Sequence, residues 1–229
     1  MRYTSALAFT PEEHRVAAAA GNPPIENPAE TTTEAWLTEL HRQTDVLVEK
    51  GYPGLAGLTE DAFRALVAPL AELLPAEPFV LVVTGALVPL DHLVERTRLR
   101  DKTGFTTMEP ADILAFGPTP EVNLPGSPVY LLADVDTGPE TRNVRPDDAL
   151  PQILASGRSP LTLDEGLAVA TQHPEWLRER NCFEMLGSRA GDKRVTGIWV
   201  SNAAPRLGWC WAGNPHSWLG MATTARRLG

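Results

Sequence analysis

The stretch VTGIWVSNAAPRLGWCWA, residues 195–212, decides the fold class because it contains two apolar runs separated by a turn. Residues 195–201 and 207–212 have the β-branched and aromatic content that is typical of strands. The intervening Ala203-Ala204-Pro205 and the earlier Gly191-Asp192 are turn sequences. The stretch therefore predicts an antiparallel hairpin near the C-terminus.

Helical patterns dominate earlier in the chain. Apolar residues recur at helical spacing from Trp36 to Val48 and are followed by Gly51, a helix terminator. A second amphipathic helix is expected from Thr59 onward, with a bend at Pro69. Two further helices are expected later: residues 146–157, which begin with a proline and two acids, and residues 162–173, which begin with the capping box TLDE.

Two apolar runs between these helices predict buried strands. Residues 79–84, FVLVVT, have no polar alternation, which indicates a central strand covered on both faces, and residues 128–138 end in an acidic turn. The sequence therefore predicts an α+β fold with N-terminal helices, a central mixed sheet and a C-terminal antiparallel hairpin. The proline-rich residues 1–30 are expected to form a flexible arm before a single domain, residues 31–229, in which lobes 31–157 and 158–229 could be distinguished.

Charge and cysteine content limit the function classes. The formal net charge of −9 over 229 residues disfavours nucleic acid as a partner. No apolar run is long enough to cross a bilayer, and the first residues lack the pattern of a secretory signal. The two cysteines, Cys182 and Cys210, suit a reducing compartment in a chain of this size. A cytoplasmic protein without a membrane partner is expected, and the sequence does not indicate an oligomeric state.

The last fifty residues differ from the rest of the chain. Residues 178–229 contain eight Lys and Arg against three Asp and Glu, and five of the six tryptophans lie between Trp176 and Trp218. A local positive surplus can attract an anionic ligand, although a solvated basic face is the more ordinary explanation. Any functional chemistry is therefore expected in this segment.

Several motifs resemble those of a family of bacterial proteins. The segments SPLTLDEG (159–166), LGSR (186–189) and GWCWAGNPHSWLG (208–220) are similar to an uncharacterised actinobacterial family with a domain of unknown function, and residues 50–53 and 135–138 fit the same pattern. The resemblance covers roughly residues 34–227. It implies a bacterial intracellular protein, and it implies no activity, cofactor or catalytic residue.

The second strand of the hairpin suggests a ligand pocket. Period-two geometry places Leu207, Trp209 and Trp211 on one face and Gly208, Cys210 and Ala212 on the other. Aromatic walls with a few convergent polar groups are typical of small-molecule sites. The predicted ligand-binding residues are Trp209, Trp211, Trp218, Asn214, Arg189, Asp192 and Arg194. Ordinary core packing of the tryptophans, with an inert Cys210, is the competing interpretation.

Cys210 and His216 are the candidate catalytic pair. A thiolate at Cys210 could use His216 as its base, with Asn214 or Asp192 orienting the imidazole. The five-residue spacing matches none of the familiar nucleophile signatures, so the pattern is weakly specific.

Zinc is a minor alternative, and the sequence assigns no metal ligand. His173, Cys182, Cys210 and His216 form a chemically suitable set but lack the closely spaced ligand pairs of structural zinc sites. No glycine-rich phosphate-binding motif follows either predicted strand. The loop at residues 187–194 could hold an anion through Arg189, but a plain hairpin turn explains it better.

Two functions from different classes remain open. In the first, the C-terminal tryptophans form a pocket for a polar or anionic metabolite, with or without catalysis. In the second, exposed tryptophans form a docking patch of a protein-interaction or regulatory module that carries out no reaction.

Overall fold

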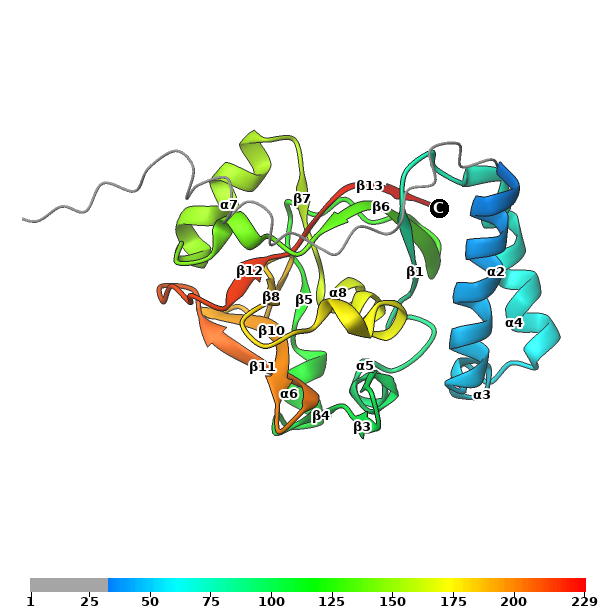
Figure 1. The fold of residues 1–229 in the computed structure, drawn as a ribbon, viewed down its shortest axis with the longest axis horizontal. Coiled ribbons are helices and arrows are strands. Elements are labelled where there is room, and N and C mark those ends of the chain that lie inside the picture. The colour runs from blue at the N-terminus through cyan, green and yellow to red at the C-terminus, as the bar shows by residue number, and fades with distance from the viewer. Residues whose placement is uncertain (1–32) are drawn as a thin grey trace, which may run out of the picture.

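The computed structural model describes residues 33–229, and the expected arm at residues 1–30 lies outside them. Two β-sheets form the body of the protein, with a helix between them and helices outside the first sheet (Figure 1). This is the α+β arrangement with N-terminal helices that the sequence predicts. Among residues 33–229, no helix combines the length and the apolar character that crossing a membrane requires.

The first sheet has four antiparallel strands in the order β1 (Phe79–Val83), β6 (Val129–Asp136), β13 (Thr223–Leu228) and β7 (Ser159–Pro160). Every residue of β1 is buried, because α2 (Thr33–Glu49) packs on this strand from one side and α8 (Leu163–Gln172) from the other. The last strand of the chain, β13, pairs with β6 from the middle of the sequence. Sheet membership therefore does not follow chain order.

The expected central position of residues 79–84 is wrong, because β1 is an edge strand of this sheet. Its free backbone edge is covered by a side chain from α2. The amide of Gln43 donates to the Phe79 carbonyl at 2.8 Å and accepts from the Leu81 N–H at 2.6 Å. Coverage by two helices explains the continuous apolar run, and Gln43 replaces the missing strand partner.

The N-terminal helices follow the sequence pattern closely. They are α2 (Thr33–Glu49), α3 (Tyr52–Leu55), α4 (Glu60–Val67) and the 3-10 helix η1 (Ala68–Leu73). Gly51 has a φ of 80°, which ends α2. The Thr59 hydroxyl accepts from Ala62 N at the start of α4, and the α-helical hydrogen bonding changes to 3-10 next to Pro69.

The second sheet is mixed and contains the predicted hairpin. Its strands lie in the order β12 (Leu219–Met221), β8 (Cys182–Met185), β10 (Arg194–Ser201), β11 (Ala204–Trp211) and β4 (Phe105–Thr106). The pairs β12–β8 and β11–β4 are parallel, and the others are antiparallel. The hairpin turn lies at Asn202 and Ala203, which have φ values of 53° and 60°, and not at residues 203–205 as expected. Pro205 is part of β11, paired with Val200.

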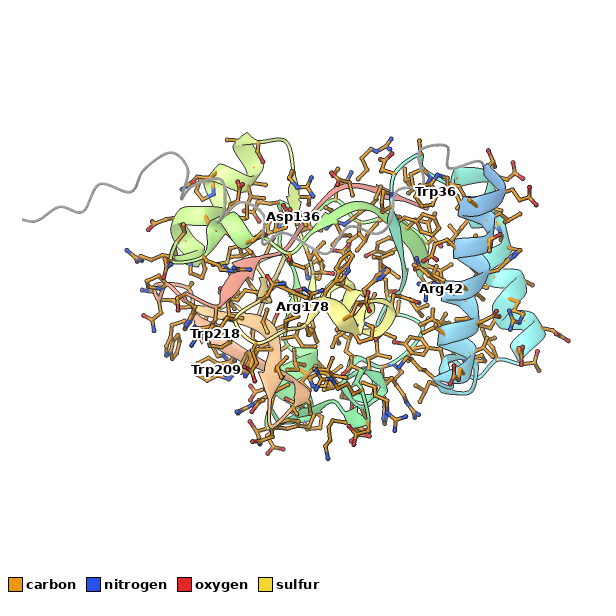
Figure 2. The ribbon with its side chains drawn as sticks, viewed as in Figure 1. Trp36, Arg42, Asp136, Arg178, Trp209 and Trp218 are labelled. Atoms are coloured by element: carbon orange, nitrogen blue, oxygen red, sulfur yellow. The ribbon has the colours of Figure 1, made fainter. Side chains whose placement is uncertain are left out.

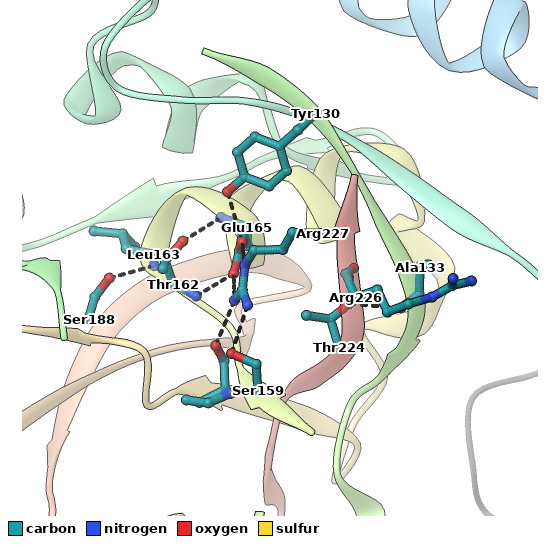
Figure 3. A network of polar contacts seen from close by, with 11 residues as sticks. Tyr130, Ala133, Ser159, Thr162, Leu163, Glu165, Ser188, Thr224, Arg226 and Arg227 are labelled. Carbon is teal, nitrogen blue, oxygen red and sulfur yellow. Dashed lines mark hydrogen bonds and ion pairs between the residues drawn. The ribbon is translucent and has the colours of Figure 1, made fainter. Parts of the chain in front are cut away.

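Helix α8 (Leu163–Gln172) lies between the two sheets and contacts β1 and β10 (Figure 1). The predicted capping box is confirmed: the Thr162 hydroxyl accepts from Glu165 N, and the Glu165 carboxylate accepts from Thr162 N. The same carboxylate accepts from Tyr130 Oη and from Arg227 Nη2, both at 2.8 Å (Figure 3). Strands β6 and β13 are thereby joined to the start of α8.

The remaining helix α7 (Pro146–Ala155) begins at the expected proline. Short elements connect these layers: α5 (Leu90–Leu93), η2 (Val94–Arg96), β2 (Arg98–Leu99), β3 (Lys102–Thr103), α6 (Pro110–Leu114), β5 (Gly117–Pro118), η3 (Pro139–Thr141), η4 (Pro174–Trp176) and β9 (Ser188–Arg189).

Candidate functional site

One face of the second sheet brings three chemically reactive side chains together. Register pairs Glu184 of β8 with Gly197 of β10, and Gly197 with Gly208 of β11, so these three residues share a face. Cys210 is two residues beyond Gly208 on the same strand and therefore also lies on this face. Gly197 and Gly208 place no side chain of their own between Glu184 and Cys210, and the Trp199 ring lies over this part of the face.

His216 reaches this face from the loop that follows β11. The ligand atoms of Glu184, Cys210 and His216 all lie within 4.8 Å of one another, and we call these three residues the Glu184 cluster. The loop is fixed on both sides of the histidine. Asn143 N donates to the His216 carbonyl at 2.9 Å, and Cys182 N donates to the Trp218 carbonyl at 3.1 Å. The expectation that Cys210 and His216 face each other therefore agrees with their placement.

Glu184 has an unusual environment for an acid. Its side chain is 0% exposed, and neither carboxylate oxygen has a hydrogen-bond partner of good geometry among the described residues. Burial raises the pKa of Glu184 to about 7, while contact with the Cys210 thiol and the charge of Arg189 lower it in part. A thiol is a weak donor, so it compensates little for lost hydration. The unpaired carboxyl group is costly to the fold, which is typical of a group kept for binding or chemistry.

The thiol and the imidazole are also shifted toward their neutral forms. Burial raises the pKa of Cys210 to about 12, and the adjacent Glu184 carboxylate contributes in the same direction. Burial lowers the pKa of His216, whose Nε2 is buried without a hydrogen-bond partner among the described residues. An activated nucleophilic cysteine needs a nearby cation, whereas Cys210 faces a carboxyl group. The surroundings of Cys210 therefore stabilise the thiol and disfavour a free thiolate.

Two tryptophans border the Glu184 cluster. The ring of Trp199 lies directly over Gly208, where an added Cβ would come within 2.3 Å of the indole. The edge of Trp218 meets the Trp199 ring at a centroid distance of 5.7 Å and the His216 ring at 5.5 Å. The Arg206 guanidinium, directly across from Trp199 on β11, lies over the Trp199 ring at 5.6 Å from its centroid. Trp199 and Trp218 therefore form an aromatic border beside the Glu184 cluster.

Trp209 and Trp211 lie on the opposite face of the same sheet. Strand alternation separates them from Cys210, and they are 37% and 48% exposed. Their rings meet edge to face at 5.0 Å, and the Arg194 guanidinium lies 5.7 Å from Trp209. Figure 2 labels Trp209 and Trp218, which lie at the same end of the molecule. Trp209 and Trp211 therefore do not contribute to the Glu184 cluster.

The other predicted binding residues are divided between the two faces. Asp192 is exposed and accepts from the backbone and side chain of Arg194, which also pairs with Asp112. Asn214 is exposed in the loop before His216. Arg189 lies nearer the Glu184 cluster, and its Nη1 is buried without a hydrogen-bond partner among the described residues.

Much of the C-terminal positive charge is neutralised by acids from elsewhere in the chain. Arg194, Arg226 and Arg227 pair with Asp112, Glu77 and Glu165. These three arginines therefore have acidic partners, and Arg189 and Arg206 are the cations that lie near the cluster and its bordering Trp199.

The four residues considered for zinc do not gather. His173 stacks on Trp176 at a centroid distance of 4.6 Å and faces Glu175. The Cys182 thiol donates to the Arg178 carbonyl, and burial raises its pKa to about 11. Only Cys210 and His216 of that set belong to the Glu184 cluster.

Sequence reasoning missed Glu184 and Trp199. A usable signal was present, because Glu184 is the one acid in the strand CFEM, whose four residues are all buried. An acid in such a strand carries a large burial cost, which points to a specific role. The sequence places Trp199 in a strand, but the face of the sheet on which its indole lies depends on how β10 pairs with β11.

A separate cavity of about 570 Å³ lies between α2, the segment around β2 and the end of α8. Its lining includes the cations Arg42, Lys50, Arg96, Arg98 and Arg100 and the acids Glu49, Glu95 and Glu175. It shares no residue with the Glu184 cluster, so the two features are distinct.

Comparison with known proteins gives one match. No curated protein and no solved structure matches the chain. The model of a family of unknown function, DUF5701, matches residues 46–229, which include all three members of the Glu184 cluster. The chain therefore belongs to this family of unknown function.

Proposed function

We propose that the protein binds a small polar metabolite at the Glu184 cluster, where Glu184, Cys210 and His216 supply the binding and reactive groups. The observation that carries the proposal is the fully buried Glu184 carboxyl group, which faces a thiol and an imidazole and has no hydrogen-bond partner of good geometry among residues 33–229. A fold keeps such a group at a cost to stability, and perturbed ionisable groups concentrate at functional sites.

The surroundings favour a ligand that combines a polar group with a flat or apolar part. Trp199 and Trp218 offer indole surface next to His216. Aromatic walls with few polar groups are the ordinary composition of small-molecule sites. An anionic ligand would meet Arg189 or Arg206, since Arg194, Arg226 and Arg227 already have acidic partners.

The role of Cys210 is proposed to be binding rather than nucleophilic attack. Its neighbour Glu184 disfavours the thiolate, which is the reactive form. His216 stays in the proposal as the group that meets the ligand from the loop side. Both cysteines are free thiols, which supports a protein of the reducing cytoplasm.

The test is a thermal-shift screen of the purified full chain against amino acids, hydroxy acids and nucleosides. We expect one compound class to raise the melting temperature, because a ligand that binds only the folded state stabilises it. The shift should disappear in Trp218→Ala and His216→Ala and persist in Trp211→Ala. Absence of any stabilising compound, or a shift that depends on Trp211 instead, would contradict the proposal.

The second candidate is a protein-interaction module that uses Trp209 and Trp211. Their exposure on the face opposite Cys210 favours it, because exposed aromatic residues are enriched in docking surfaces. A partner of this kind should be lost in Trp211→Ala and retained in Trp218→Ala, which is the reverse of the result expected for the metabolite site.

A further inference from the structure

The Glu184 cluster has the composition of a metal site. Among residues 33–229, it is the group of three or more His, Cys, Asp or Glu side chains whose ligand atoms converge. We infer that Glu184, Cys210 and His216 bind one divalent metal ion of the zinc type, with a fourth position open to the ligand. This inference deepens the proposed function, and it rests on that function only for the ligand at the fourth position.

The three ligand atoms are slightly farther apart than the ligands of a bound zinc ion, so they would have to move closer together to coordinate it. The three ligand atoms lie within 4.8 Å of one another. Tetrahedral ligands bound at roughly 2.0–2.3 Å from zinc are about 3.3–3.8 Å apart. Side-chain rotations that bring the ligand atoms about 1 Å closer together would therefore complete the site.

A cation would satisfy the polar atoms that the protein leaves unpaired. The Glu184 oxygens and His216 Nε2 are buried and lack hydrogen-bond partners among the described residues. A divalent ion bound to one Glu184 oxygen and one His216 ring nitrogen would give both side chains a strong partner. On binding, the Cys210 thiol loses its proton to solvent and its sulfur lone pair forms the metal bond, so the charge of the thiolate is neutralised at once.

The donor set selects the metal. Thiolate and imidazole are soft and intermediate ligands, which favour zinc over magnesium or calcium. Three protein ligands with an open fourth position are typical of catalytic zinc sites, whereas structural sites use four protein ligands. A ligand with a carboxylate, hydroxyl or carbonyl oxygen could occupy that position beside Trp218. The cluster thus replaces the zinc set suggested by the sequence, with Glu184 in place of His173 and Cys182.

The test uses Zn²⁺ and Co²⁺ alone on the metal-free full chain. We expect one equivalent of Zn²⁺ per chain, and Co²⁺ should produce a thiolate-to-cobalt charge-transfer band in the near ultraviolet. Cys210→Ser should remove the band. Glu184→Gln and His216→Ala should weaken Zn²⁺ binding by more than the roughly 10–100-fold that is typical of second-shell changes.

Cys182→Ser is the matched control, because it removes the other buried thiol and leaves the cluster intact. Retention of the band in Cys182→Ser and its loss in a folded Cys210→Ser would support the inference. No binding at one equivalent, or a band that survives in Cys210→Ser, would overturn it.

Failure of the metal site and failure of the proposed function have different signatures. A compound whose stabilising effect depends on Trp218 and His216, in a protein that takes up no Zn²⁺, would overturn the metal site and keep the function. Stoichiometric metal with the Cys210 band, and no stabilising compound in the screen, would keep the metal site and overturn the function.

Discussion

The Glu184 carboxyl group distinguishes the candidate site, because it is fully buried and has no hydrogen-bond partner of good geometry among the described residues. Cys210 and His216 were found because the two lie close together in an unusual motif. Glu184 comes from another strand, and only the register of β8 against β10 places it beside them. Residues that are near in sequence could thus be predicted, and the partner that depends on strand pairing could not.

Replacement of Glu184 should raise the free energy of unfolding although it removes a group of the proposed site. We expect Glu184→Met to stabilise the metal-free protein by about 1–3 kcal/mol, because it removes a buried, unpaired carboxyl group and keeps a similar volume. Urea unfolding in the presence of a chelator measures this difference. Glu179→Met, at an exposed position, is the control and should change stability by about 0.5 kcal/mol or less. A clear loss of stability in Glu184→Met would mean that the carboxyl group has a structural partner.

At the scale of elements, local sequence signals are sufficient to predict where several of the helices begin and end. Caps and terminators such as Thr59, Gly51 and the box from Thr162 to Glu165 act within a few residues, so the sequence predicted them correctly. Strand positions within a sheet depend on distant segments. For this reason the sequence did not predict that β1 is an edge strand. The apolar run of β1 indicates that helices cover both of its faces, but it does not indicate how many strands pair with it.

The edge of β1 gives a prediction about α2. Gln43→Met should destabilise the protein by about 1–3 kcal/mol, because it leaves the Phe79 carbonyl and the Leu81 N–H buried without their side-chain partner. Chemical denaturation measures the change. Gln152→Met, which removes an amide from the exposed side of α7, should have a much smaller effect. Equal effects of the two substitutions would show that Gln43 does not protect this edge.

The hairpin turn gives a second prediction at this scale. Asn202 and Ala203 form the two-residue turn, in which Ala203 has a φ of 60°. This left-handed backbone conformation favours glycine. We expect Ala203→Gly to raise the free energy of unfolding by about 1 kcal/mol. The neighbouring Ala204→Gly lies within β11 and should instead lower it. The sequence predicts the turn one to two residues later because proline is typical of turns, whereas Pro205 pairs with Val200 within β11. If Ala203→Gly is neutral or destabilising, the left-handed turn is not formed as described.

The whole molecule is held together by a buried network that joins the last strand to the helix between the sheets. The Arg227 and Glu165 side chains are 6% and 0% exposed, and Tyr130 donates to the same carboxylate (Figure 3). The sequence indicated the capping role of Glu165. It did not indicate the partner Arg227, because that pairing requires β13 to return to the first sheet.

Adjacent arginines allow a matched test of this network. Arg227→Met should lower the free energy of unfolding by about 3–5 kcal/mol, because it leaves the Glu165 carboxylate buried with one fewer charged partner. Arg226→Met should cost about 1 kcal/mol or less, since Arg226 is 54% exposed and pairs with Glu77 at the surface. Similar losses in both variants would contradict the assignment of a central role to Arg227.

The most direct test of the Glu184 cluster is a crystal structure of the full chain grown with Zn²⁺, with anomalous diffraction recorded at the zinc absorption edge. The account predicts one strong peak roughly 2.0–2.3 Å from Cys210 Sγ, a His216 ring nitrogen and a Glu184 oxygen. The absence of a peak among these three side chains, or a peak held by Cys182 or His173 instead, would contradict it.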